Sequence, residues 1–244
     1  MDRALFAFGL VVLLAFTVEA ALGFGATVVA LSVGALLLPL ESLLSVLVPL
    51  NLVVSTWIVA REWRLVDGRR LFLRVLPLMG LGLPLGMLAL STLAPTVAKA
   101  VFGAFVIALS LGELVRARGG VLARPPGAVA SALLLALGGV VHGAFATGGP
   151  LVVYVLGRTL DDKGRFRATL SALWLLLNAV LVVAFALRGA LSTETLLSSA
   201  KLLGFLAAGL VVGEALHRRV PAELFRRLVF GLLLVAGALL VVNG

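Results

Sequence analysis

Glu19 and His142 are ionisable residues inside apolar stretches of the chain, each a few positions before a glycine-rich motif. Placing a charge in apolar surroundings is costly, so such a residue is by default a functional candidate. A histidine exchanges a proton near neutral pH, and a carboxylate can carry one as well. Glu19 and His142 are therefore predicted to carry a coupling proton. The alternative is that each side chain only satisfies exposed backbone groups at its own motif.

The two glycine-rich motifs, Ala21–Thr27 and Gly143–Pro150, lie where an apolar helix would otherwise continue. Glycines let the backbone turn, and proline suits the first turn of a new helix. A helix that starts there points unpaired N–H groups and the positive end of its dipole at an anion. The alternative role of the glycines is close helix packing. The residues predicted to bind the substrate are Gly23, Phe24, Gly25, Ala26 and Thr27 in the first motif and Thr147, Gly148, Gly149 and Pro150 in the second.

Two asparagines, Asn51 and Asn178, carry amide groups deep inside apolar segments. Such amides can tie helices together by hydrogen bonds, or they can contact a ligand or the glycine motifs. The hydroxyl groups of Thr27 and Thr147 can cap a helix or donate to a ligand oxygen. We assign both asparagines to the predicted substrate site.

The composition identifies an integral membrane protein. Of the 244 residues, 62% are hydrophobic and 13% are charged, and the mean hydropathy is +1.21, whereas a soluble domain carries about 25% charged residues. The apolar runs lack the alternation of a barrel and indicate an all-α polytopic fold embedded in the lipid bilayer. Ten segments are predicted: 4–22, 26–40, 43–60, 71–93, 97–115, 127–145, 149–160, 168–187, 196–216 and 224–243.

The chain also excludes several classes of function. It has no cysteine and only two histidines, so we expect no metal site and no cofactor. Its net charge of +9 comes from basic residues in short loops, which favours an orientation signal over nucleic-acid binding. No nucleophile stands beside a base at helical spacing, so an enzyme is not expected. An ATP-binding Gly-x-x-x-x-Gly-Lys motif is absent, so any energy must come from a gradient.

The two halves of the chain are related by an internal duplication. Asn51 and Asn178, and likewise Arg61 and Arg188, are 127 positions apart, and other pairs follow the same offset. A linker at 116–126 is predicted to separate a membrane repeat at 1–115 from one at 127–244. Because each repeat has five segments, the second should be inverted in the membrane.

The loop charges predict an orientation for ten alternating segments. The loops at 61–74, 116–124, 158–167 and 218–227 hold 16 of the 20 Lys and Arg residues. This side is therefore cytoplasmic, together with the linker, and both termini are periplasmic. Segments 26–40 and 149–160 are short, which is typical of a transporter's binding site, and they either span the bilayer or re-enter it. Arg74 and Lys201 lie near helix starts, where a basic side chain reaches the interface or draws anions inward.

The chain resembles the TauE/SafE family of sulfite and organosulfonate transporters. The resemblance covers nearly the whole chain and is carried by Gly23–Gly25, Thr147–Pro150, the loop Arg61–Arg64 and the glycine–proline patterns at 82–95 and 209–221. It implies a gradient-driven permease of the inner membrane for a small sulfur-containing anion such as sulfite, a sulfonate or a sulfocarboxylate. An anion channel and a permease for a small carboxylate stay open as alternatives, as does the choice between a monomer and a homodimer.

Overall fold

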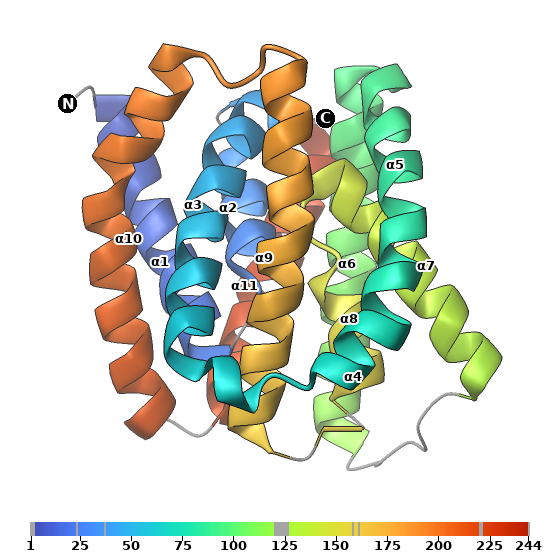
Figure 1. Ribbon diagram of the computed structural model, residues 1–244. Coiled ribbons are helices and arrows are strands. Elements are labelled where there is room, and N and C mark those ends of the chain that lie inside the picture. The colour runs from blue at the N-terminus through green and yellow to red at the C-terminus, as the bar shows by residue number, and fades with distance from the viewer. Residues whose placement is uncertain are drawn as a thin grey trace. The chain divides into compact units, whose positions relative to one another are not determined.

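The computed structural model describes residues 3–22, 24–36, 38–119, 127–157, 159–160, 162–219 and 222–243 (Figure 1). These residues form helices joined by turns and bends, and the described parts contain no strand. The elements are α1 (Arg3–Leu22), α2 (Ala26–Gly34), α3 (Leu40–Glu62), η1 (Trp63–Leu65), α4 (Gly68–Arg70), the π-helical turn η2 (Leu71–Val75), α5 (Leu76–Thr92), α6 (Pro95–Gly119), α7 (Ala128–Phe145), α8 (Gly149–Leu156), α9 (Lys163–Leu187), α10 (Thr193–Arg219) and α11 (Ala222–Asn243).

Six helical stretches in the described parts are long and apolar enough to cross a membrane. Two shorter apolar helices cover Leu5–Ala21 and Phe230–Val242. The all-helical polytopic class predicted from the sequence is thus confirmed at this level. The six long stretches are Leu40–Leu65, Gly68–Thr92, Pro95–Gly112, Ala128–Phe145, Lys163–Leu187 and Thr193–Leu216.

The helices that follow the two glycine motifs are short. α2 has nine residues and α8 has eight, so they rise about 14 and 12 Å, against a hydrocarbon thickness of about 30 Å. Both end earlier than predicted, at Gly34 instead of 40 and at Leu156 instead of 160. A helical prediction overshoots here because Ala35 and Leu36, although apolar, form a turn, and Gly157 and Thr159 form turns after α8. Neither helix can cross the bilayer by itself.

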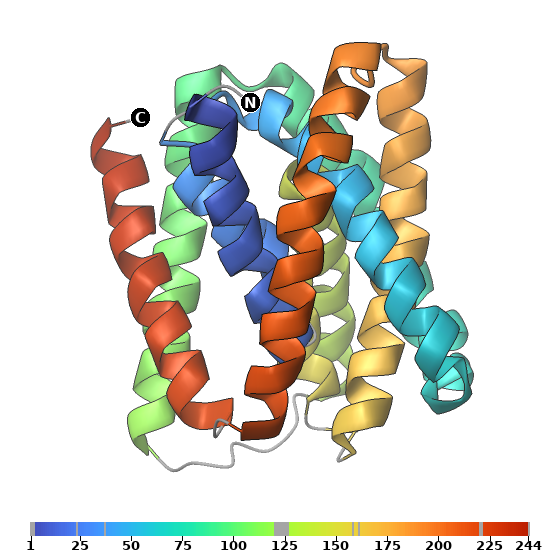
Figure 2. The ribbon, with the colours of Figure 1, turned by 90° about the vertical axis from the view of Figure 1, so that its left-hand side faces the viewer.

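The chain divides into two compact units, and the first comprises Met1–Leu47, Leu93–Leu122 and Ser192–Gly244. Within it α1 packs along α10, α6 along α11 and α2 against α1 (Figures 1 and 2). Gly209 and Gly213 of α10 let the α1 backbone approach closely. A Cβ atom built on them would lie 2.6 and 2.5 Å from carbonyl oxygens of α1.

The second unit comprises Val48–Thr92 and Ala123–Leu191. Here α5 packs along α7, and α8 packs against α7 (Figure 1). Gly82 and Gly86 of α5 face Gly139 and Gly143 of α7, and a Cβ atom on any of the four would collide with a backbone carbonyl of the other helix. The two helices are therefore in backbone contact, which only small residues allow. Each unit draws helices from both halves of the sequence.

Polar contacts fix the loop end of the second unit. The Arg167 side chain forms an ion pair with Glu62, which joins the start of α9 to the end of α3. The backbone N–H of Asp67 donates to the Thr169 hydroxyl at 2.9 Å. The Asp67 side chain in turn caps α4 by accepting from the Arg70 N–H at 3.0 Å. The loop that carries these residues is thereby held against α9.

Candidate anion-binding site

The second glycine motif forms a sharp break between α7 and α8. Ala146 closes α7 in the left-handed conformation, with φ 50°, and Pro150 lies in the first turn of α8. Proline fits there because its missing N–H would have had no helical partner. A Cβ atom on Gly148 would collide with the backbone carbonyl of Gly138. The break therefore lies directly against α7, and Gly148 is required for that packing.

His142 is hydrogen-bonded to the backbone of this break. Its side chain is 1% exposed, its Nδ1 accepts a hydrogen bond from the Gly148 N–H at 3.4 Å, and its ring stacks on Trp174 at 5.4 Å between centroids. Because Nδ1 is the acceptor, the proton of the neutral imidazole sits on Nε2. Nε2 is buried and has no hydrogen-bond partner among the described residues. The side chain of Asn178 lies within interaction range of His142, so the Nε2–H can donate to Asn178 or to a ligand.

Unused donors lie beside His142. The Thr147 side chain is 4% exposed, and its hydroxyl has no partner among the described residues. The N–H groups of Gly149 and Leu151, at the start of α8, take part in no hydrogen bond within the described chain. A buried unpaired polar group costs about 1–3 kcal/mol, so several such groups make this break the candidate site for an acceptor-rich ligand. An anion with several oxygen atoms fits this set.

Asn51 and Asn178 are joined directly. The Asn178 Nδ2 donates to Asn51 Oδ1 at 2.8 Å, and the Ser55 hydroxyl donates to the same oxygen at 3.2 Å. The amide pair therefore ties α3 to α9, as the first interpretation of these residues expected. Asn178 also lies within interaction range of His142, and its own Oδ1 is buried without a hydrogen-bond partner among the described residues. Ser55, Asn51, Asn178 and His142 thus form a chain of neighbouring polar side chains from α3 to the break.

The first glycine motif, in the other unit, has a related arrangement. Glu19 is 3% exposed, and its Oε2 accepts a hydrogen bond from the Ala26 N–H at 3.1 Å. Gly25 precedes α2 with φ 108°, a conformation that favours glycine. Thr27 is buried in the first turn of α2, and Phe24 is half-buried. Gly23 lies outside the described residues.

Glu19 and His142 therefore play the same part in the two breaks. Each stands on the helix before the break and accepts a hydrogen bond from an N–H at the start of the following short helix. These contacts agree with the alternative role, in which each side chain satisfies exposed backbone groups at its own motif. They also place the one ionisable side chain of each break directly on an N–H that an anion would use. No cluster of three or more metal-ligating side chains occurs within the described ranges.

The second unit thus brings together most of the predicted residues: His142, Thr147, Gly148, Gly149, Pro150, Asn51 and Asn178, while Glu19 and the first motif belong to the other unit. Sequence reasoning missed Trp174 and Ser55. Both stand one helical turn from a predicted asparagine, Trp174 before Asn178 and Ser55 after Asn51. That spacing puts each pair on one helix face, and it could have identified Trp174 and Ser55 as neighbours of the site from the sequence.

Comparison with known proteins gives one match. No curated protein and no solved structure matches the chain. A family model described as sulfite exporter TauE/SafE matches residues 8–240, which is nearly the whole length. The chain belongs to the sulfite exporter TauE/SafE family of membrane transporters.

Proposed function

We propose that the protein is a secondary transporter that moves a small sulfur-containing anion across the bacterial inner membrane, coupled to a proton gradient. Family membership supports transport of a sulfur oxyanion. Sulfite, a sulfonate or a sulfocarboxylate has oxygen acceptors that match the donors at the break in the second unit. The protein works by alternating access around a midplane site, to which the starts of α8 and α2 contribute their N–H groups.

The observation that carries this proposal is the set of buried, unused donors at the start of α8. Within the described chain, the Thr147 hydroxyl lacks a partner, the His142 Nε2–H has only the nearby Asn178 side chain within interaction range, and the helix start adds backbone N–H groups. None of these donors is a fixed cation. A Lys or Arg at the bilayer centre would cost several kcal/mol and would hold the anion too tightly for release. Neutral donors bind an anion and still let it leave.

The helix pairing supports the paired site and the inverted repeat. α1 packs along α10 in one unit, and α7 packs along α5 in the other. In the predicted repeat, α1 corresponds to α7 and α10 to α5. The same pair of helices thus recurs, with the partners taken from opposite halves of the sequence. This recurrence is what a duplicated and interleaved architecture produces, and it gives each unit one break with one ionisable acceptor.

The proposed proton coupling follows from the hydrogen bonds that Glu19 and His142 accept from backbone N–H groups. The Glu19 carboxylate makes a charge-assisted hydrogen bond to the Ala26 N–H, and protonation of the carboxylate weakens that bond. A proton on His142 Nδ1 removes the acceptor of the Gly148 N–H altogether. In both breaks, proton uptake releases an N–H to the anion. Proton and anion therefore bind cooperatively, and by linkage the anion also favours proton uptake.

The surroundings of the two groups suit this role. α2 and α5 carry no ionisable residue, and α8 carries only Tyr154. Glu214 on α10 follows Gly213, which packs against α1, and the basic residues of α9 are confined to its first two turns, at 163–167. The ionisable residues of α11 are likewise confined to its first turns, at 223–227. In the second unit, α5 and α8, which pack along α7, thus carry no charged residue.

A decisive functional test is counterflow of radiolabelled sulfite in proteoliposomes. A carrier is accelerated by unlabelled substrate on the far side, whereas an anion channel is not. Replacing sulfite with acetate as the unlabelled anion separates a sulfur-oxyanion carrier from a carboxylate permease. Absence of counterflow with sulfite, taurine and sulfoacetate alike would contradict the proposal.

Thr147→Val tests the site with little structural disturbance. Valine has the shape of threonine without the hydroxyl, so the variant loses an unpaired buried group and should unfold at a higher temperature without ligand. A hydrogen bond to a charged group contributes about 1.5–3 kcal/mol, so sulfite affinity should fall about tenfold or more. Thermal unfolding with and without sulfite gives both quantities. Unchanged affinity would remove Thr147 from the site.

The proposed orientation can be tested on the naturally cysteine-free chain. Arg69 is exposed in the loop end of the second unit, and we expect a cysteine at this position to react with a membrane-impermeant maleimide only from the cytoplasmic side. Right-side-out and inside-out vesicles provide the two sides, and a cysteine at exposed Thr193 is the control expected to react from the periplasm. Periplasmic reaction at position 69 would overturn the proposed topology.

A further inference from the structure

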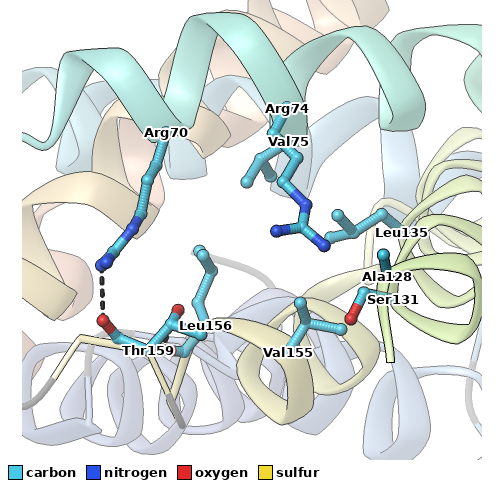
Figure 3. Close-up of a pocket in the computed structure, with 9 residues that line it drawn as sticks. All are labelled: Arg70, Arg74, Val75, Ala128, Ser131, Leu135, Val155, Leu156 and Thr159. Carbon is cyan, nitrogen blue, oxygen red and sulfur yellow. Dashed lines mark hydrogen bonds between the residues drawn. The ribbon is translucent and has the colours of Figure 1, made fainter. Parts of the chain in front are cut away.

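A second polar feature of the same unit is a cavity of about 320 Å³ that lies apart from the glycine break. It is bounded by η2, the first turns of α7 and the end of α8 (Figure 3). Among the described residues, its charged lining residues are Arg70 and Arg74, and none of the described lining residues is a carboxylate. A cavity of this size accommodates a small ion with some of its water.

The two arginines differ in what they already bind. Arg70 Nη1 donates to the backbone carbonyl of Thr159, just beyond α8, and forms an ion pair with Asp67 at 3.6 Å. Its charge is thus balanced by a carboxylate and by the negative end of a helix. Arg74 has neither an ion pair nor a hydrogen bond among the described residues. Figure 3 shows its guanidinium group extending into the cavity.

The opposite wall adds to the positive potential. Ala128 and Ser131 belong to the first turn of α7, at the positive end of the helix dipole, where the Ser131 N–H already donates to the Gly127 carbonyl at 2.9 Å. Arg74 itself stands in the π-helical turn η2, a departure from regular helix that is frequent at functional sites. The unpaired charge of the exposed Arg74 and a positive helix end therefore share one cavity. Its described lining has no acidic side chain, and the carbonyl just beyond α8 is already bound by Arg70.

We propose that this cavity is a second binding site, for a small oxyanion with a sulfur or phosphorus centre, with Arg74 as the residue that binds it. The guanidinium group presents paired N–H donors that match two oxygens of such an ion. In a transporter of sulfur-containing anions, the site serves as a vestibule that concentrates the substrate. The identity of its biological ligand therefore rests on the proposed function, whereas the preference of the site for an oxyanion does not. By the loop charges it opens on the cytoplasmic side. A lipid phosphate headgroup has the same chemistry and is the other source of the ligand.

The test measures the cavity directly, without transport. A cysteine at Ala128, which is exposed in the cavity wall, is reacted in detergent with an anionic and a cationic methanethiosulfonate reagent of similar size. A positive potential favours the anionic reagent. We expect Arg74→Gln to lower the ratio of the two rates roughly fivefold or more at low salt. Arg74→Lys should restore most of the ratio, and Arg69→Gln, a charge loss outside the cavity, should leave it within about twofold.

Protection then identifies the source of the ligand. Inorganic sulfate that slows labelling at position 128 in lipid-free detergent, but not in the Arg74→Gln background, identifies a free anion. Protection only in nanodiscs that contain phosphatidylglycerol, compared with phosphatidylcholine, identifies a headgroup. Protection by neither, or a rate ratio unaffected by Arg74→Gln in protein that elutes as a single folded species, would overturn the site. Because no step requires transport, a failure of sulfite counterflow would contradict the proposed function and leave this test intact.

Discussion

Glu19→Gln and His142→Gln will each abolish accumulation of sulfite driven by a pH gradient. Glutamine at either position can still accept the hydrogen bond from the backbone N–H at the start of the short helix, but it cannot take up a proton. The break keeps its geometry while the proton no longer regulates it. The expected result is exchange without accumulation.

The size of the effect follows from the gradient. One singly charged anion that moves with one proton carries no net charge, and one pH unit supplies about 1.4 kcal/mol, or about tenfold accumulation. In either variant the ratio of internal to external sulfite should fall to about one, while counterflow continues. The measurement is sulfite uptake into proteoliposomes with an imposed pH gradient.

A matched control is Glu194→Gln, which removes a carboxylate from the exposed first turn of α10. It should retain full accumulation. A loss in only one of Glu19→Gln and His142→Gln would assign the proton to that residue. Full accumulation in both would exclude the coupling mechanism, and an increase of sulfite affinity at low pH that survives when both substitutions are combined would exclude it as well.

Much of this arrangement could be predicted from the sequence because glycine and proline act locally. The breaks lie where Gly25 and Pro150 indicated them, since a left-handed turn or a missing N–H determines the backbone regardless of its surroundings. The 127-residue offset selected Asn51 and Asn178, which are hydrogen-bonded. That offset carries tertiary information, which apolar periodicity does not.

Other features were beyond sequence reasoning for a physical reason. Helices in a membrane can be apolar on all faces, so hydropathy does not indicate which helices pair or which glycines are in contact. Gly148 illustrates this: it was predicted to let an anion approach, but its missing side chain makes room for the carbonyl of Gly138. Substituting it would therefore disturb packing first, and Thr147 is the better probe of the ligand. The Thr147 hydroxyl has no hydrogen-bond partner among the described residues. The absence of a partner depends on the three-dimensional surroundings of the hydroxyl and cannot be read from the sequence.

Gly86→Ala is expected to have the largest effect on stability. A Cβ atom at Gly86 would collide with the backbone carbonyl of Val140 in α7, and a carbonyl in a helix cannot move aside alone. The helices α5 and α7 must separate along their contact. Overpacking costs about 1–3 kcal/mol and more where backbone is the obstacle, which exceeds the roughly 1 kcal/mol that alanine gains over glycine in a helix.

The same helix provides the control. A Cβ atom added to Gly80 would meet no described atom within 4 Å, so Gly80→Ala should raise the melting temperature slightly while Gly86→Ala lowers it strongly or prevents folding. In the other unit Gly213→Ala, whose new Cβ atom would lie 2.5 Å from the Thr17 carbonyl oxygen, should behave like Gly86→Ala, and Gly204→Ala like Gly80→Ala. Folded Gly86→Ala protein, recovered at low temperature, should bind sulfite with nearly native affinity because Gly86 lies outside the break. A native melting temperature for Gly86→Ala would contradict the backbone contact between α5 and α7.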